Sequence, residues 1–287
     1  MQHYLLFLFI IIIICICFWF LYNNSNTNNT NGYSNKNYDY AIMPVQISLP
    51  LTLSDDLFWI NLSLTPLDVT NYNNYNFILD SGSDLITIPS SSCDQCTGSR
   101  WPGSLTTPIK SDSYQGGQVI SYQLTSGFSP TLNQNLQLAV MVDGSSNPDG
   151  VTVNLFGLLN PTLRLSYLRV DFPRLSVMFG ANAIPSAVST LTWSSLHRLP
   201  YWAIPVQFMP QIEWIILDTG SNYVMIDQSY GITSDFSFNI GNQKISVPAN
   251  LIRYRPALIP NSIILGNRIM RQYCWLFDLI NMRVAIL

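Results

Sequence analysis

Residues 77–83 read FILDSGS, and residues 215–221 read IILDTGS. Each segment is an apolar run that ends in an aspartate, and the aspartate is followed by a hydroxyl residue, a glycine and a serine. A second apolar run then follows each segment, LITI at 85–88 and YVMI at 223–226. Short apolar runs bounded by turn residues are typical of buried strands. The sequence therefore predicts two strands that each deliver an aspartate into a tight loop.

A later apolar-apolar-glycine pattern also occurs twice, at 155–157 (LFG) and at 264–266 (ILG). An aspartate before a glycine is commonly only a turn residue, and a single copy would favour that interpretation. Two matching copies, each with its own downstream glycine pattern, indicate instead an internal duplication that repeats an Asp-containing loop.

Asp80 and Asp218 are the candidate catalytic residues. Two carboxyl groups that meet near a two-fold axis do not both ionise easily, so the pair shares one proton and titrates in coupled steps. The ionised member can take a proton from water, while the protonated member polarises a carbonyl oxygen. This is general acid–base hydrolysis without a covalent intermediate.

The neighbours of the two aspartates are candidates for supporting the dyad: Ser81, Gly82, Ser83, Thr219, Gly220 and Ser221. We expect the glycines to turn the backbone tightly beneath each carboxylate by adopting a positive φ. The hydroxyl residue directly after each aspartate can bond across the axis. The serine three positions after each aspartate can donate to the outer carboxylate oxygen.

The composition excludes several other classes of protein. Only 10% of the 287 residues are charged, the net charge is −3, and no basic run is present, which argues against a nucleic-acid partner. Frequent aromatic residues and scattered Pro and Gly favour an all-β fold. The two histidines, His3 and His197, have no arranged partners, so we expect neither a His-based nucleophile nor a metal site, and no cofactor.

Cys93 and Cys96 form a Cys-x-x-Cys pair among five cysteines. They can be two loop thiols, half of a zinc site, or a small-loop disulfide. A four-ligand zinc site would need a second such pair, which the sequence lacks. We favour a disulfide, which implies an oxidising compartment.

Residues 4–22 are 19 uncharged, almost wholly apolar residues. As a helix they would span about 28 Å, close to the thickness of a bilayer core. A cleaved signal peptide is the alternative, but the aromatic end of the run suits a membrane interface and favours a transmembrane signal anchor. The Asn-rich residues 23–40 are predicted to form a flexible tether. Asn61-Leu62-Ser63 matches the glycosylation acceptor pattern.

The chain resembles the pepsin-like aspartic protease family. The resemblance lies in the two active-site segments, the glycine-bearing segment of the first half and the closing stretch: 77–93, 214–227, 154–163 and 263–287. It implies an all-β, bilobal fold with a cleft between two duplicated lobes, here residues 41–170 and 171–287, which follow the predicted transmembrane helix of residues 1–22. It also implies an endopeptidase that acts on peptides or proteins, and the abundant apolar residues favour cleavage between bulky apolar side chains. We expect a monomer that is anchored in a membrane by the apolar run. The acceptor pattern and the Cys93/Cys96 pair favour a catalytic domain on the lumenal or extracellular side.

The family also has a β-hairpin flap that carries a tyrosine. Tyr114, followed by Gly116 and Gly117, fits this position best, and Tyr122 is the alternative. The chain departs from the family at several positions: Thr87 replaces a tryptophan that supports the flap, Asn267 replaces an aspartate after Leu-Gly, and Asp84 directly follows the first motif. A catalytically inactive relative that binds peptides or proteins in the cleft is the alternative function. The intact dyad with all its hydroxyl neighbours favours the enzyme.

Overall fold

The computed structural model describes residues 47–67, 71–94, 96, 99–114, 118–144, 154–184, 190–199, 201–257 and 259–287. All of these belong to one compact unit, residues 40–287. Strands dominate the described residues, whose helices are single turns: η1 (Ala181–Ala183), η3 (Gln228–Tyr230), η4 (Ala249–Leu251) and α2 (Asn267–Met270). The prediction of an all-β fold is confirmed.

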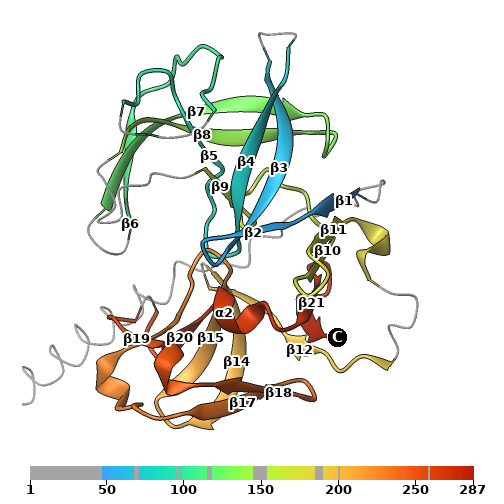
Figure 1. Cartoon of the computed structure of the whole chain (residues 1–287), viewed down its shortest axis with the longest axis vertical. Helices are drawn as coiled ribbons and strands as arrows, with labels where there is room; N and C mark the ends of the chain where they lie inside the picture. Colours follow the sequence, from blue (N-terminus) through green and yellow to red (C-terminus); the bar gives the residue numbers. More distant parts are fainter. Residues whose placement is uncertain are drawn as a thin grey trace, which may run out of the picture. The chain divides into compact units, whose positions relative to one another are not determined.

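The first half of the unit forms an eight-stranded sheet in the order β5-β8-β7-β3-β4-β9, with β2 paired to β3 and β6 paired to β7 (Figure 1). Its strands are β2 (Thr52–Ser54), β3 (Leu57–Pro66), β4 (Asn73–Asp80), β5 (Thr87–Pro89), β6 (Lys110–Tyr114), β7 (Gln118–Ser129), β8 (Gln134–Gly144) and β9 (Leu155–Gly157). Strand β3 buries every second side chain, as a strand with one face on the core must.

The second half forms a six-stranded sheet in the order β13-β14-β15-β20-β16-β19, and β17 and β18 form a separate two-stranded sheet. The strands are β13 (His197–Leu199), β14 (Tyr201–Met209), β15 (Ile212–Asp218), β16 (Val224–Ile226), β17 (Phe236–Ile240), β18 (Gln243–Val247), β19 (Ile252–Tyr254) and β20 (Ser262–Gly266). All five residues of β20 are buried, in keeping with its central place between β15 and β16.

A third sheet joins strands from distant parts of the sequence in the order β1-β11-β10-β21-β22-β12. These are β1 (Ile47–Pro50), β10 (Tyr167–Asp171), β11 (Ser176–Phe179), β12 (Ser194–Ser195), β21 (Cys274–Asp278) and β22 (Arg283–Ile286). Strand β10 spans residues 170 and 171, where we divide the two predicted lobes, and that division stays a prediction.

The two halves place their repeated motifs in the same way. Strand β4 pairs with β9 in parallel and β15 pairs with β20 in parallel, so that Asp80 lies opposite Gly157 and Asp218 lies opposite Gly266. A Cβ on Gly157 would lie 2.4 Å from the Leu85 carbonyl oxygen, and one on Gly266 would lie 2.1 Å from that of Tyr223. Only glycine fits at either position, which explains the apolar-apolar-glycine repeat.

None of the helices in the described part of the chain has the length and hydropathy that a membrane span requires. The predicted anchor at residues 4–22 lies outside the described residues, as does the tether up to residue 40. Both stay predictions.

Candidate active site

The structure brings Asp80 and Asp218 together. Each aspartate is the last residue of its strand, β4 or β15. A Cβ built on Gly82 would lie 2.6 Å from the Asp218 Cγ, and one built on Gly220 would lie 2.6 Å from the Asp80 Cγ. Each carboxyl group therefore packs directly against the glycine of the opposite loop, and the two carboxyl groups share a hydrogen bond.

Ser81 and Thr219 join the two loops by reciprocal hydrogen bonds. The Ser81 N–H donates to the Thr219 Oγ1 at 3.0 Å, and the Thr219 N–H donates to the Ser81 Oγ at 3.0 Å. Each hydroxyl then donates to a carbonyl of the opposite strand, Ser81 to Leu217 at 2.9 Å and Thr219 to Leu79 at 2.6 Å. Both side chains are buried and fully bonded, so the loops are fixed to one another rather than merely adjacent.

The two carboxyl groups differ in the donors that hold them. The Gly82 N–H donates to Asp80 Oδ1 at 2.8 Å, and the Gly220 N–H donates to Asp218 Oδ1 at 2.9 Å. The Ser221 hydroxyl adds a bond to Asp218 Oδ2 at 2.7 Å.

Ser83, the equivalent of Ser221, behaves differently. Its Oγ accepts from the Leu85 N–H at 3.3 Å, and within the described part of the chain it makes no bond to Asp80. The expected donation by Ser83 is thus not present. Because donors to a carboxylate favour its charged form, the arrangement favours Asp218 as the ionised member of the pair.

The reason for the loop glycines differs from the expected one. Neither Gly82 nor Gly220 is among the described glycines with a positive φ, so the prediction of a left-handed turn at these positions is wrong. Their lack of a side chain matters instead, because any Cβ would overlap the opposite carboxyl group.

The environment of Asp80 opposes its ionisation. Its side chain is only 8% exposed. Burial raises the pKa of Asp80 well above its usual value, the negative charge of Asp218 raises it further, and the Gly82 N–H bond opposes the rise. The pair therefore keeps a proton, assigned here to Asp80, at a pH at which an isolated aspartate would have lost it.

Strands β6 and β7 form an antiparallel hairpin at the place predicted for the flap. Tyr114 ends β6 and pairs with Gln118 of β7. Gly116 and Gly117, and the side chain of Tyr114, lie outside what the structure describes. The alternative, Tyr122, is buried in a small cluster with the half-cystines and with side chains of β8, as a packed strand residue would be.

Two departures from the family pattern have structural roles. Thr87 is 1% exposed, and its Oγ1 accepts from the Leu155 N–H at 2.8 Å, which holds β9 in place beside β5. Asn267 is fully buried at the start of α2; its N–H donates to the Ser221 carbonyl at 2.5 Å, and its Nδ2 donates to the Asp56 carbonyl at 2.7 Å. The third departure, Asp84, is exposed beside the first loop.

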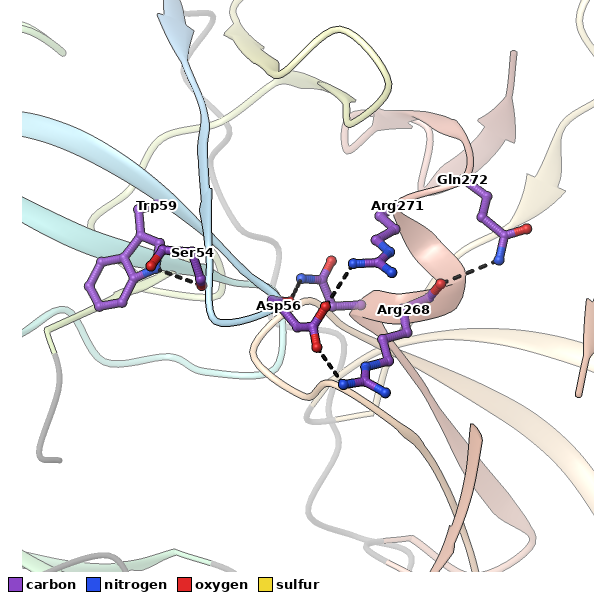
Figure 2. A network of polar contacts seen from close by, with 7 residues as sticks. Ser54, Asp56, Trp59, Arg268, Arg271 and Gln272 are labelled. Carbon is purple, nitrogen blue, oxygen red and sulfur yellow. Dashed lines mark hydrogen bonds and ion pairs between the residues drawn. The ribbon is translucent and has the colours of Figure 1, made fainter. Parts of the chain in front are cut away.

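Asp56 connects the β2–β3 turn to α2, as Figure 2 shows. Its carboxylate forms ion pairs with Arg268 and, at 2.8 Å, with Arg271. Because Asn267 also contacts the loop that follows Asp218, this network joins the first sheet to the second active-site loop.

Cys93 and Cys96 form a disulfide. The Arg100 guanidinium closes the same loop by donating to the carbonyls of Ser90 at 3.0 Å and of Cys96 at 2.6 Å, and also to that of Cys93. Among the residues that the structure describes, no group of three or more His, Cys, Asp or Glu side chains could hold a metal ion.

One charged residue near the dyad was missed from the sequence. Arg255 follows β19, and its guanidinium lies close enough to Asp218 to interact with its charge. The segment IRYR at 252–255 alternates in the manner of a strand, but only the pairing of β19 with β16 reveals which face these arginines occupy.

No protein-family model matches the chain, and no curated protein matches it.

Proposed function

We propose that the chain is an aspartic endopeptidase of the pepsin-like family, with two β lobes at residues 41–170 and 171–287 and a cleft between them. One observation carries the proposal: each of two strand-terminal aspartates packs against the glycine of the other's loop, and the loops are joined by reciprocal hydrogen bonds. A turn-forming aspartate needs neither a second carboxyl group nor a fixed partner loop.

The proposed reaction follows from the unequal surroundings of the two carboxyl groups. Asp218, which accepts bonds from Gly220 and Ser221, takes a proton from water, and the resulting hydroxide attacks the peptide carbonyl carbon. Asp80 gives its proton to the carbonyl oxygen. The tetrahedral intermediate then collapses, the proton on Asp218 passes to the leaving nitrogen, and Asp80 regains its proton from the hydroxyl group. No covalent intermediate forms.

The proposed substrate is an extended peptide with bulky apolar residues at the scissile bond. The sheet face that carries Asp218 has a small buried apolar cluster. Half-buried apolar side chains pack against this cluster, and they are Leu199, Tyr201, Trp214, Met225 and Ile259. Such a surface suits apolar side chains, and the β6–β7 hairpin is the proposed flap over them.

The proposed setting is a membrane, with residues 4–22 as the anchor and the catalytic domain on the lumenal or extracellular side. The Cys93–Cys96 disulfide supports that side, because disulfides persist in oxidising compartments. We propose that the enzyme is monomeric.

The decisive test is cleavage of a peptide library by the purified full-length chain and by Asp80→Asn, Asp218→Asn and the double variant. We expect each single variant to lose nearly all activity, and the double variant to lose little more, because the carboxyl groups act as one unit. Pepstatin should inhibit the unmodified enzyme. Substantial activity in either single variant would refute the mechanism, and peptide binding without any cleavage by the unmodified chain would favour the inactive binding protein.

A further inference from the structure

Arg255 lies on the sheet face that carries Asp218. Across the second sheet, Ile216 pairs with Ile264 and Ile264 pairs with Met225, so these side chains share one face. Met225 in turn pairs with Arg253. Side chains two residues apart in a strand point to the same side, so Asp218, two residues beyond Ile216, and Arg255, two residues beyond Arg253, lie on this face. Because β19 runs antiparallel to β15, the two residues extend toward opposite ends of their strands.

The backbone continues this pattern to Arg255 itself, because its N–H donates to the Ile226 carbonyl at 3.0 Å. The small apolar cluster of this face consists of Ala203 on β14, Ile216 on β15 and Ile264 on β20, and Met225 on β16 packs against it. The guanidinium therefore belongs to the same surface as the proposed substrate-binding residues.

The guanidinium of Arg255 has no partner in the described part of the chain. Its Nε is buried without a hydrogen bond, and no ion pair joins it to any described carboxylate, Asp218 included. Arg253, two residues earlier, differs: it stacks over the Tyr223 ring at 4.0 Å and donates to the carbonyls of Asn250 and Ile252.

A half-buried cation without a partner is costly, so an unpaired guanidinium on the face that carries Asp218 points to a ligand. Burial lowers the pKa of Arg255, and the negative charge of Asp218 opposes that effect, although no ion pair among the described residues joins the two groups. An arginine stays charged throughout the ordinary pH range. Its planar fork matches a carboxylate, which it can bind through two parallel hydrogen bonds.

We propose that Arg255 forms a carboxylate-binding subsite of the cleft, so that the enzyme selects peptides carrying a carboxylate near the scissile bond. This inference rests on the proposed function and refines its substrate class. Three strand spacings of about 4.8 Å separate β15 from β19 along the sheet. The two residues are further separated along the strand direction, so the substrate carboxylate is not adjacent to the scissile bond but lies a few residues from it, and the residues that flank the bond remain apolar.

The test uses the full-length chain and peptides with one fixed apolar pair at the scissile bond. Glutamate is compared with glutamine at each of the three positions on either side, and a free C-terminal carboxylate is compared with an amide. These two arms distinguish an acidic side chain from a chain terminus. We expect a carboxylate at one position to raise kcat/KM about tenfold over its neutral counterpart, equivalent to one charge-assisted bond pair.

In Arg255→Gln this ratio should fall to about one, and Arg255→Lys, which keeps the charge without the fork, should give an intermediate ratio. Arg164→Gln is the matched control, because it removes an equal charge from an exposed site outside this sheet. The same ratio should appear in peptide affinity when catalysis is blocked by Asp80→Asn. Added salt should reduce the ratio for the unmodified enzyme.

An unchanged ratio in Arg255→Gln, or no preference for a carboxylate at any position, would overturn the subsite. If Arg255→Gln does not fold, the ratio in Arg255→Lys and the salt dependence decide in its place. Failure to cleave any peptide would instead count against the proposed function, and peptide affinity in Asp80→Asn would still test the subsite.

Discussion

Ser221 and Ser83 occupy equivalent positions in the two repeated loops, but only Ser221 donates to a carboxylate. We expect Ser221→Ala to lower kcat/KM by about tenfold or more, because a hydrogen bond to a charged group contributes about 1.5–3 kcal/mol. Ser83→Ala is the matched control and should have a much smaller effect. Steady-state kinetics on one peptide would test the pair, and equal losses would show that the asymmetry has no catalytic role.

Asp80 should make folding stability depend on pH. Its pKa is raised in the folded protein, mainly by burial, so the folded state binds more protons than the unfolded state between the usual pKa and the raised one. Stability therefore falls as pH rises through that window. Asp80→Asn removes this penalty, so it should raise the melting temperature at neutral pH and have little effect below the usual aspartate pKa.

The control for this measurement is Asp84→Asn, which removes a charge from an exposed position of the same loop. Melting temperatures of both variants across the pH range would show whether the gain in stability of Asp80→Asn is confined to neutral pH. A gain for Asp80→Asn that is equally large in acid would contradict the assignment of a raised pKa.

At the residue scale, the sequence was sufficient to predict which aspartates meet, because the motif occurs twice with all its flanking residues. It did not predict why glycine is needed, since the constraint at Gly82 and Gly220 is the opposite carboxyl group rather than the local backbone. Arg255 was missed for a related reason, because its face depends on strand pairing and not on neighbours in sequence.

Among the elements, the short helix α2 depends on contacts with the β2–β3 turn. No side chain caps its N-terminus. Asp56, which has a positive φ of 61°, supplies ion pairs to Arg268 and Arg271 instead. Hydrogen bonds from these arginines lower the pKa of Asp56, Arg268 first, and burial opposes them. The stabilisation is therefore present above the usual aspartate pKa and is lost as pH falls below it.

We expect Asp56→Asn to lower the free energy of unfolding at neutral pH by about 0.5–1 kcal/mol, because the paired groups are about one-third exposed and solvent screens them. Asp55→Asn, at the neighbouring exposed turn position, should have a smaller effect. Urea unfolding of both variants at neutral and acidic pH would measure the difference. A loss of stability for Asp56→Asn that persists in acid would mean that the ion pairs are not its source.

The elements themselves were predictable where the pattern was local. The apolar runs that end at Asp80 and Asp218 indicated strands, and these runs form β4 and β15. The family resemblance indicated a hairpin around Tyr114, and β6 and β7 form a hairpin there. The role of Thr87 was not predictable, because its hydroxyl binds the backbone of β9, which is distant in sequence.

For the whole molecule, the third sheet is the feature furthest from local sequence. It pairs β1 near the start of the described chain with β11, and β10 with β21 near its end. Such pairings depend on the packing of the complete chain, so the local sequence patterns did not predict this sheet.

Residues 4–22 are long and apolar enough to hold the chain in a bilayer, so the full chain should stay in the membrane fraction after alkaline washing, and removal of residues 1–22 should release it. Glycosylation of Asn61 would show on which side of the membrane the catalytic domain lies. Asn61 is exposed on β3 and belongs to the only glycosylation acceptor pattern in the sequence of the folded part. If the catalytic domain is lumenal or extracellular, Asn61→Gln should remove one glycan from the glycosidase-sensitive shift. Asn71→Gln, at an exposed asparagine outside any acceptor pattern, should leave the shift intact. Digestion of the catalytic domain by protease added to sealed vesicles from the cytosolic side would place it on the opposite side and refute the topology.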